Sequence, residues 1–164
     1  MTAARTLQWI PEPGLAILNM RQAAKSAGML VVLDYNHAQN KWEPDPPEEF
    51  RQFYRAFLAW RHSNQWDNEI ADHVPELFRF ARLNEIESYI QDEVVERGDQ
   101  EFPEQTALWS YVIKNVGEQI AKAGFCTQSQ LLEAQDRYDS WAKIDLVRQT
   151  LTMRAVTGRV AELS

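Results

Sequence analysis

Hydrophobic residues along the chain form both an unbroken run and helical repeats, which predicts a mixed α/β fold. Met29–Leu33 is an uninterrupted apolar run between a glycine and an aspartate, as expected of a parallel strand that is buried on both faces. Before it lies a short amphipathic helix that Pro11 and Pro13 can start and that should end near residues 25–28. Helix, turn and buried strand together make half of an α/β unit.

Four polar or amphipathic residues follow this run: Asp34, Tyr35, Asn36 and His37. In α/β sheets ligands bind outside the carboxyl ends of the parallel strands, so these residues are expected at a functional site. Asp and Asn are also ordinary turn formers at strand ends. The sequence leaves both interpretations open.

The rest of the chain predicts further helices and strands. Helices are expected at about 47–61, 69–81, 104–123 and 127–145, because apolar residues recur there at intervals of three and four. Strands are expected at 84–95, where apolar residues alternate, and at 149–160, which is rich in Thr, Val and Leu. The prediction is one α/β domain over 1–164 with a helical insert at about 42–82 and a small mixed three-stranded sheet.

The helix expected at 47–61 has a broad aromatic face. Phe53, Phe57 and Trp60 recur along it at spacings of four and three, so this face should be shielded from solvent. Packing in a hydrophobic core explains such a face. The wall of a pocket for an apolar or aromatic substrate explains it as well, and the sequence does not separate the two.

Composition and charge narrow the class of protein. A net charge of -7 and an isoelectric point near 5.0 argue against nucleic-acid binding. No segment is apolar for long enough to cross a bilayer, and the first residues lack a signal-peptide pattern, so a cytoplasmic protein is expected. Cys126 is the single cysteine, which excludes an internal disulfide or a cysteine-based metal cluster, and three dispersed histidines predict no metal site.

Three segments near the start of the chain carry a family resemblance: LQWIPEP at 7–13, KSAG at 25–28 and MLVVLD at 29–34. They resemble the segment after the fourth strand, the Lys-Pro-Gly-Gly turn and the fifth strand of class I S-adenosylmethionine-dependent methyltransferases of the ubiquinone/menaquinone-biosynthesis type. The turn here lacks the proline and one glycine. Gln8 and Trp9 stand where that family has histidines.

The resemblance implies the C-terminal part of a Rossmann-like methyltransferase, with S-adenosylmethionine as cofactor and a small, apolar or aromatic molecule as methyl acceptor. It places Leu7, Gln8 and Trp9 beside cofactor and substrate, and Tyr35, Asn36 and His37 facing the substrate. His37 is then the candidate base, and the aromatic helix with Phe53, Phe57 and Trp60 forms a lid over the acceptor. His62 and His73 are expected to be surface or core histidines.

The glycine-rich loop that approaches the cofactor in this family is missing from the sequence. The six glycines are not clustered, and neither a buried strand before Pro11 nor an acidic residue for the ribose is evident. We therefore expect the substrate-side half of a methyltransferase, inactive alone, that binds S-adenosylmethionine weakly or not at all. The alternative is a catalytically inactive binding or dimerisation module derived from a methyltransferase.

The resemblance also predicts how the strands are arranged. The last strand, 149–160, should insert between Met29–Leu33 and 84–95 and run antiparallel to both. With no fourth strand beside it, Met29–Leu33 should expose an unpaired edge, at which two copies would form a homodimer. The alternative is that residues 2–10 fold back over this edge and leave a monomer.

Overall fold

The computed structural model describes residues 1–162 and confirms a mixed α/β chain. The chain divides into two compact units. Unit one comprises Met1–Gln39, Asn64–Asp92 and the chain from Leu151 onward, and unit two comprises Asn40–Ser63 and Glu93–Thr150. The two helices of the insert expected at about 42–82 belong to different units, the first to unit two and the second to unit one.

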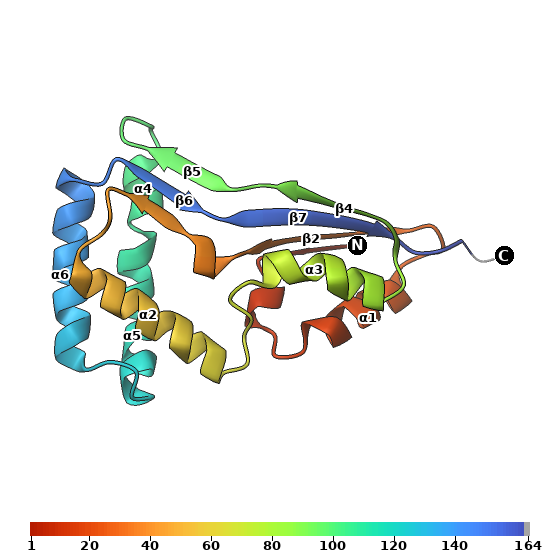
Figure 1. The fold of residues 1–164 in the computed structure, drawn as a ribbon, viewed down its shortest axis with the longest axis horizontal. Coiled ribbons are helices and arrows are strands. Elements are labelled where there is room, and N and C mark those ends of the chain that lie inside the picture. Colours follow the sequence, from red (N-terminus) through yellow and green to blue (C-terminus); the bar gives the residue numbers. More distant parts are fainter. Residues whose placement is uncertain (163–164) are drawn as a thin grey trace. The chain divides into compact units, whose positions relative to one another are not determined.

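Unit one is built on a four-stranded sheet in the order β1-β2-β7-β4 (Figure 1). Its strands are β1 (Thr2–Ala4), β2 (Met29–Tyr35), β7 (Met153–Arg159) and β4 (Asn84–Ile90). β1 is parallel to β2, whereas β7 is antiparallel to both β2 and β4. The predicted insertion of the last strand between the two earlier ones is confirmed.

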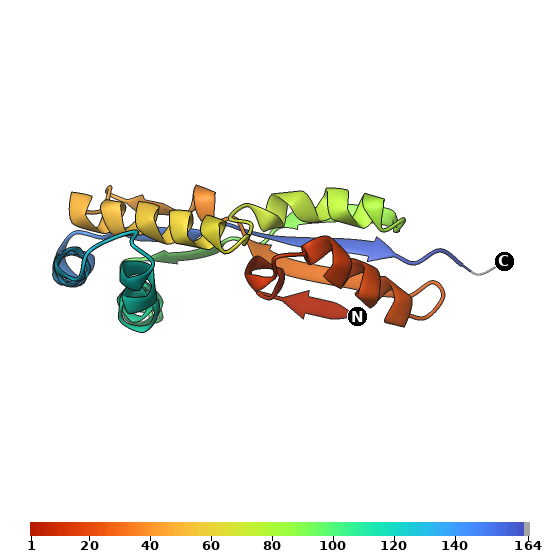
Figure 2. The ribbon, with the colours of Figure 1, turned by 90° about the horizontal axis from the view of Figure 1, so that it is seen from below.

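The prediction that Met29–Leu33 has an unpaired edge is wrong, because β1 pairs with residues 31–33 of β2. Figure 2 shows β1, red and beside the N-terminus, next to the orange strand β2. Two amides extend the pairing, since Val31 donates to Met1 O at 2.9 Å and Arg5 donates to Leu33 O at 2.8 Å. β1 has three residues and no fully buried side chain, so no hydrophobic run marks it as a strand. Its pairing matches the alternative expectation, in which residues 2–10 fold back over this edge. The edge expected to hold a second copy is covered by the chain itself.

Helices α1 (Pro13–Ala23) and α3 (Ile70–Phe80) pack against the same face of this sheet (Figure 1). The sheet and these helices share one hydrophobic core, which includes Leu7, Ile17, Leu30, Val32, Ile70, Val74, Phe78 and Val156. Gly158 of β7 allows the close approach of α3, because a Cβ atom there would lie 2.8 Å from Cδ2 of Phe78. The core therefore fixes the strand ends relative to α3.

Unit two combines a three-stranded sheet with helices. The sheet has the order β3-β6-β5 and is formed by β3 (Lys41–Glu43), β6 (Arg148–Leu151) and β5 (Glu93–Glu96). The helices are α2 (Glu48–Ser63), α4 (Phe102–Thr106), α5 (Leu108–Lys122) and α6 (Gln128–Ile144). Thr127 caps α6 as predicted, in a capping box with Gln130.

Two segments predicted as single strands are each divided. Residues 84–95 form β4 and β5, and residues 149–160 form β6 and β7. The breaks occur at polar positions, where Asp92 Oδ1 accepts the amide of Met153 at 2.9 Å and Thr152 O accepts the amide of Asn36 at 2.8 Å. Such bonds compete with the strand ladder, so the sequence pattern overestimates strand length.

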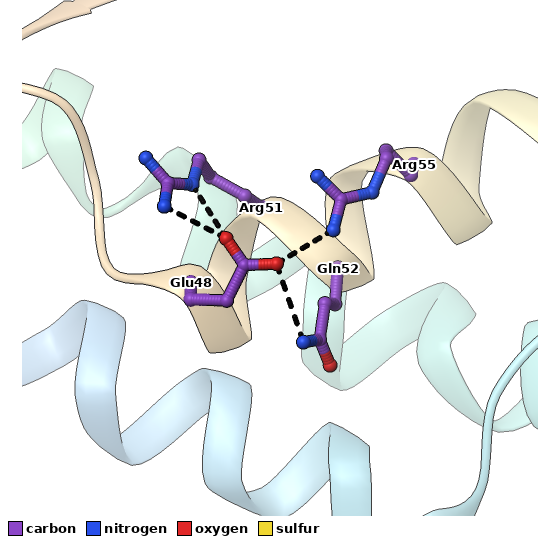
Figure 3. A network of polar contacts seen from close by, with 4 residues as sticks. All are labelled: Glu48, Arg51, Gln52 and Arg55. Carbon is purple, nitrogen blue, oxygen red and sulfur yellow. Dashed lines mark hydrogen bonds and ion pairs between the residues drawn. The ribbon is translucent and has the colours of Figure 1, made fainter.

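A carboxylate at the start of α2 lies among polar side chains of the same helix (Figure 3). Glu48 accepts hydrogen bonds from Arg55 at 2.7 Å, from Arg51 at 2.9 Å and from Gln52 at 3.3 Å. These bonds, that of Arg55 first, lower the pKa of Glu48 to about 2. The Glu48 side chain is 48% exposed, so water screens these ion pairs.

Candidate functional site

Two segments that follow parallel strands meet at one end of the sheet of unit one. β1 leads to the short 3-10 helix η1 (Leu7–Trp9), and β2 leads through Asn36 to η2 (His37–Gln39). Because β1 and β2 run parallel, their carboxyl ends lie at the same edge of the sheet. This edge is where the sequence predicts a functional site.

Asp34 connects the two segments. Its Oδ2 atom accepts the amides of Leu7 at 2.8 Å and Gln8 at 3.3 Å, and its Oδ1 atom accepts the amide of Tyr35 at 3.1 Å. Burial raises the pKa of Asp34, and these backbone hydrogen bonds oppose the rise. The carboxylate therefore orders η1 against the end of β2, which is a structural role.

His37 and Gln8 form a buried pair across the two segments. His37 Nε2 lies 2.6 Å from Gln8 Oε1, and Gln8 Nε2 donates to Arg5 O at 3.3 Å, which orients the amide oxygen toward the ring. An amide oxygen can only accept, so Nε2 carries a proton, and in a neutral imidazole the lone pair then lies on Nδ1. The ring of Tyr35 stacks on His37 with centroids 5.3 Å apart.

A second polar group lies around Asn36, which is fully buried. Its Nδ2 atom donates to Asp72 Oδ2 at 2.6 Å, and the other oxygen of Asp72 accepts from Nε of Arg154. Oδ1 of Asn36 is buried and accepts no hydrogen bond from the described residues. A buried acceptor of this kind needs a bound water or a ligand with a donor.

The sequence did not reveal Asp72 and Arg154. They come from α3 and β7, and no spacing along the chain links either residue to Asn36. Their juxtaposition depends on two tertiary features, the packing of α3 on the sheet and the register in which Arg154 faces Asp34 across β2 and β7. Only the strand order was predictable from the sequence. This order sets β7 beside β2 and so places Arg154 at this end of the sheet.

The three residues expected beside the cofactor have different surroundings. Leu7 is 1% exposed and belongs to the core of unit one, whereas Gln8 bonds His37. Trp9 is 43% exposed and meets Trp66 edge to face, with ring centroids 5.1 Å apart. Of these three residues, the structure brings Gln8 into contact with the candidate base.

Phe53, Phe57 and Trp60 lie on α2 in unit two, and all three are buried. Phe57 contacts the rings of Phe53 and Trp60, with centroids 6.4 and 6.5 Å away, and meets Trp109 edge to face at 5.7 Å. The structure shows core packing for these rings. A role for them at the substrate stays a prediction.

The other two histidines lie at the surface. His73 Nδ1 is 2.6 Å from Asp67 Oδ2, a contact that raises the pKa of His73, and His62 is exposed near the end of α2. Within residues 1–162, no three His, Cys, Asp or Glu side chains are grouped closely enough to hold a metal ion. Over the same residues, no helix has both the length and the apolar character needed to cross a membrane.

The residues of unit one do not fit a complete S-adenosylmethionine site. Gly28 serves a tight turn, since a Cβ atom there would lie 2.7 Å from Lys25 O, and Gly158 serves helix packing. Asp34, the carboxylate at the end of β2, accepts backbone amides. Neither a glycine-lined approach to a nucleotide nor a carboxylate placed for ribose hydroxyls is present among the described residues of this unit.

Searches for relatives found structural neighbours only. No protein-family model and no curated protein matches the chain. Phosphoethanolamine N-methyltransferase 2 of Haemonchus contortus, bound to phosphomonomethylethanolamine and S-adenosylhomocysteine, is 10% identical, with a TM-score of 0.45 over 98% of this chain and 33% of that protein. A protein of Bacillus halodurans assigned to the methyltransferases is 11% identical, with a TM-score of 0.48 over 98% of this chain and 68% of its own.

A third neighbour is the [4+2]-cyclase SpnF, which is 15% identical, with a TM-score of 0.44 over 99% of this chain and 50% of that protein. The chain thus spans one third of the first neighbour and half of the third. With TM-scores below 0.5, these likenesses carry no argument about the chemistry of this chain.

Proposed function

We propose that this chain is the acceptor-side part of an S-adenosylmethionine-dependent methyltransferase. The observation that carries the proposal is the sheet of unit one, in which β7 is antiparallel between β2 and β4 while β1 and β2 are parallel. The family resemblance of residues 7–34 predicts this position for β7. The same arrangement brings Gln8 to His37.

His37 has the chemistry of a general base for a methyl acceptor. An acceptor hydroxyl or amine loses a proton when it is methylated, and neutral imidazole takes up protons near neutral pH. The hydrogen bond to Gln8 fixes the ring so that Nδ1 is the basic atom. Gln8 is thus a positioning residue for His37.

Asn36 favours a methyl acceptor that has a hydroxyl or amine group. Its buried Oδ1 atom can accept a hydrogen bond from the hydroxyl or amine that is to be methylated. The rings of Tyr35, Trp9 and Trp66 lie on the same segments or next to them and favour a small acceptor with an aromatic or apolar body.

We propose that a segment other than the described residues supplies the cofactor side of the reaction, because the described residues of unit one do not form a nucleotide cradle. The test begins with the coding DNA upstream of Met1. We expect an open reading frame with a glycine-rich segment after a predicted strand, and its absence would reject the methyltransferase proposal. The longer polypeptide is then assayed for transfer of a tritiated methyl group to phenolic and amine acceptors.

The assay of the longer polypeptide also tests the base. Replacing His37 with Gln should lower kcat by about 10²- to 10⁴-fold, the range for loss of a general base. His62→Gln, at an exposed histidine, is the matched control and should leave kcat unchanged. Equal turnover by wild type and His37→Gln would remove His37 from the chemistry.

The lack of a cofactor cradle favours one alternative, a non-catalytic binding module derived from a methyltransferase. That module would bind aromatic amines or phenols near Asn36 and His37 with no methyl transfer by any longer form of the chain. Turnover by the longer polypeptide therefore separates the two functions.

A further inference from the structure

Unit two contains a cavity of about 300 Å³ between α4, the start of α5 and the second half of α6. This volume lies at the lower end of the range for small-molecule sites, so the occupant would be small. The lining residues all belong to unit two. They are Arg97, Phe102, Pro103, Thr106, Ala107, Ser110, Tyr138, Asp139, Ala142 and Lys143.

The walls of the cavity are mostly apolar and are held in place by the protein. Tyr138 donates its hydroxyl to Thr106 O at 2.8 Å, and the Thr106 hydroxyl donates to Phe102 O at 2.7 Å. Both hydroxyls are therefore engaged by the chain, and Tyr138 is itself fully buried, so neither group offers a donor to a ligand. Burial, the larger effect, and the nearby Asp139 raise the pKa of Tyr138, which keeps its hydroxyl protonated.

Arg97 fixes one side of the cavity. Its side-chain nitrogens donate to three carbonyl oxygens near the end of α6, those of Ala142, Lys143 and Leu146, at distances of 2.8 to 3.2 Å. Its guanidinium group lies 5.2 Å from the centroid of the Phe102 ring. Arg97 therefore ties Phe102 to the end of α6, so the cavity is formed before any ligand binds.

More positive than negative side chains line the cavity. Asp139 lies one helical turn before Lys143 on α6, a spacing at which the two side chains could pair. Asp139 instead accepts the hydroxyl of Ser110 from α5. No carboxylate of the described residues lies within ion-pair distance of Lys143, so the lining carries two cations, Arg97 and Lys143, against one carboxylate.

We propose that this cavity binds a small molecule with an aromatic or apolar body and one carboxylate. The body would contact Phe102, Ala107 and Ala142, and the carboxylate would face Lys143 at the rim. Apolar contact supplies affinity and Lys143 supplies the preference for an anion. This inference does not depend on the proposed methyltransferase function, because it uses residues of unit two alone.

Three fluorinated probes of similar size test the proposal by fluorine NMR: fluorobenzoate, neutral fluorobenzamide and cationic fluorobenzylamine. We expect fluorobenzoate to bind about three- to fivefold more tightly than fluorobenzamide, as fits one exposed ion pair, and fluorobenzylamine to bind most weakly. Lys143→Gln should remove the preference for fluorobenzoate and leave fluorobenzamide binding unchanged. Lys122→Gln, at an exposed lysine outside the cavity that pairs with Glu118, should change neither.

Filling the cavity gives an independent test. Ala107→Phe places a ring at the wall and should abolish binding of all three probes, with folding checked by circular dichroism. The proposal is overturned if no probe binds at millimolar concentration, if fluorobenzamide or fluorobenzylamine matches fluorobenzoate, or if a folded Ala107→Phe protein still binds fluorobenzoate. Should Ala107→Phe not fold, the Lys143→Gln comparison decides the outcome alone.

Discussion

Two carboxylates, one in each unit, have the same number of hydrogen-bond partners, but their pKa values are shifted in opposite directions. Asp34 in unit one is buried at the end of β2 and accepts backbone amides from Leu7, Gln8 and Tyr35. Glu48 in unit two is exposed at the start of α2 and accepts from two arginines and a glutamine. The pKa of Asp34 is raised, mainly by burial, whereas the pKa of Glu48 is lowered to about 2.

The difference shows that the number of hydrogen bonds does not measure what a charged residue does for the fold. Around Asp34 the partners are fixed amides in a dry environment, so the carboxylate determines where η1 lies. Around Glu48 the partners are flexible side chains in water. They supply the same number of hydrogen bonds, but no desolvation cost opposes them. Burial therefore decides which of the two residues the architecture needs.

The largest effect is expected when Asp34 is replaced with Leu. This change leaves three buried amides without an acceptor, so the free energy of unfolding should fall by about 3–5 kcal/mol. Urea unfolding followed by circular dichroism measures it. Asp34→Asn keeps one acceptor oxygen and should cost about 1–2 kcal/mol. A loss for Asp34→Leu no larger than that for Asp34→Asn would mean that the amides of η1 find other partners.

A smaller loss of stability is expected at Gln8, whose amide donates to Asp34. Gln8→Met keeps the size of the side chain but removes the acceptor for His37 Nε2, so the protein should lose about 1–2 kcal/mol of stability. Gln22→Met, at an exposed position of α1, is the matched control and should be neutral within error. Equal unfolding curves for the two variants would show that the Gln8–His37 bond adds nothing to stability.

The fold of unit one was largely predictable from the sequence because its signals are local or carried by the family resemblance. Pro13, the apolar run at 29–33 and the glycine before it indicate α1 and β2, and the resemblance indicates the place of β7. β1 is too short to leave a pattern. The sequence gives no sign of the breaks at Asp92 and Thr152, because both depend on bonds to residues distant in sequence.

The contact between the two segments of the candidate site was predictable, but the hydrogen-bond partners of its residues were not. The residues at the end of β2 meet η1 as expected, yet Asp34 bonds amides and His37 bonds Gln8. Burial and partner identity are tertiary properties, which spacing along the chain does not encode. For the same reason the sequence could not decide whether the aromatic face of α2 was core or pocket, and missed the link from Asn36 to Asp72.

The two carboxylates should respond to pH in opposite directions. The native pKa of Asp34 lies above its ordinary value of 3.8, so between these values the folded state binds more protons than the unfolded state. The stability that wild type has relative to Asp34→Asn should therefore fall as pH rises through this window and then level off. Unfolding curves at a series of pH values from about 3 to 7 measure this difference. A difference that grows with pH would contradict a raised pKa.

The smallest effect is expected for Glu48→Gln. The native pKa of about 2 lies below the ordinary value of 4.5, so the contribution of Glu48 is complete above that value and is lost as pH falls toward about 2. At neutral pH the change should lie within the error of a urea unfolding curve, because the ion pairs are exposed. If Glu48→Gln destabilised the protein as much as Asp34→Leu, burial would not be the deciding factor.

A calorimetric titration of this chain with S-adenosylmethionine tests the proposed acceptor-side role. The proposed acceptor-side residues lie in unit one, whose described residues form no nucleotide cradle, so we expect no saturable binding at micromolar concentrations of the cofactor. A dissociation constant in the low micromolar range would contradict it, because about 8 kcal/mol of binding free energy requires a cofactor site within residues 1–164.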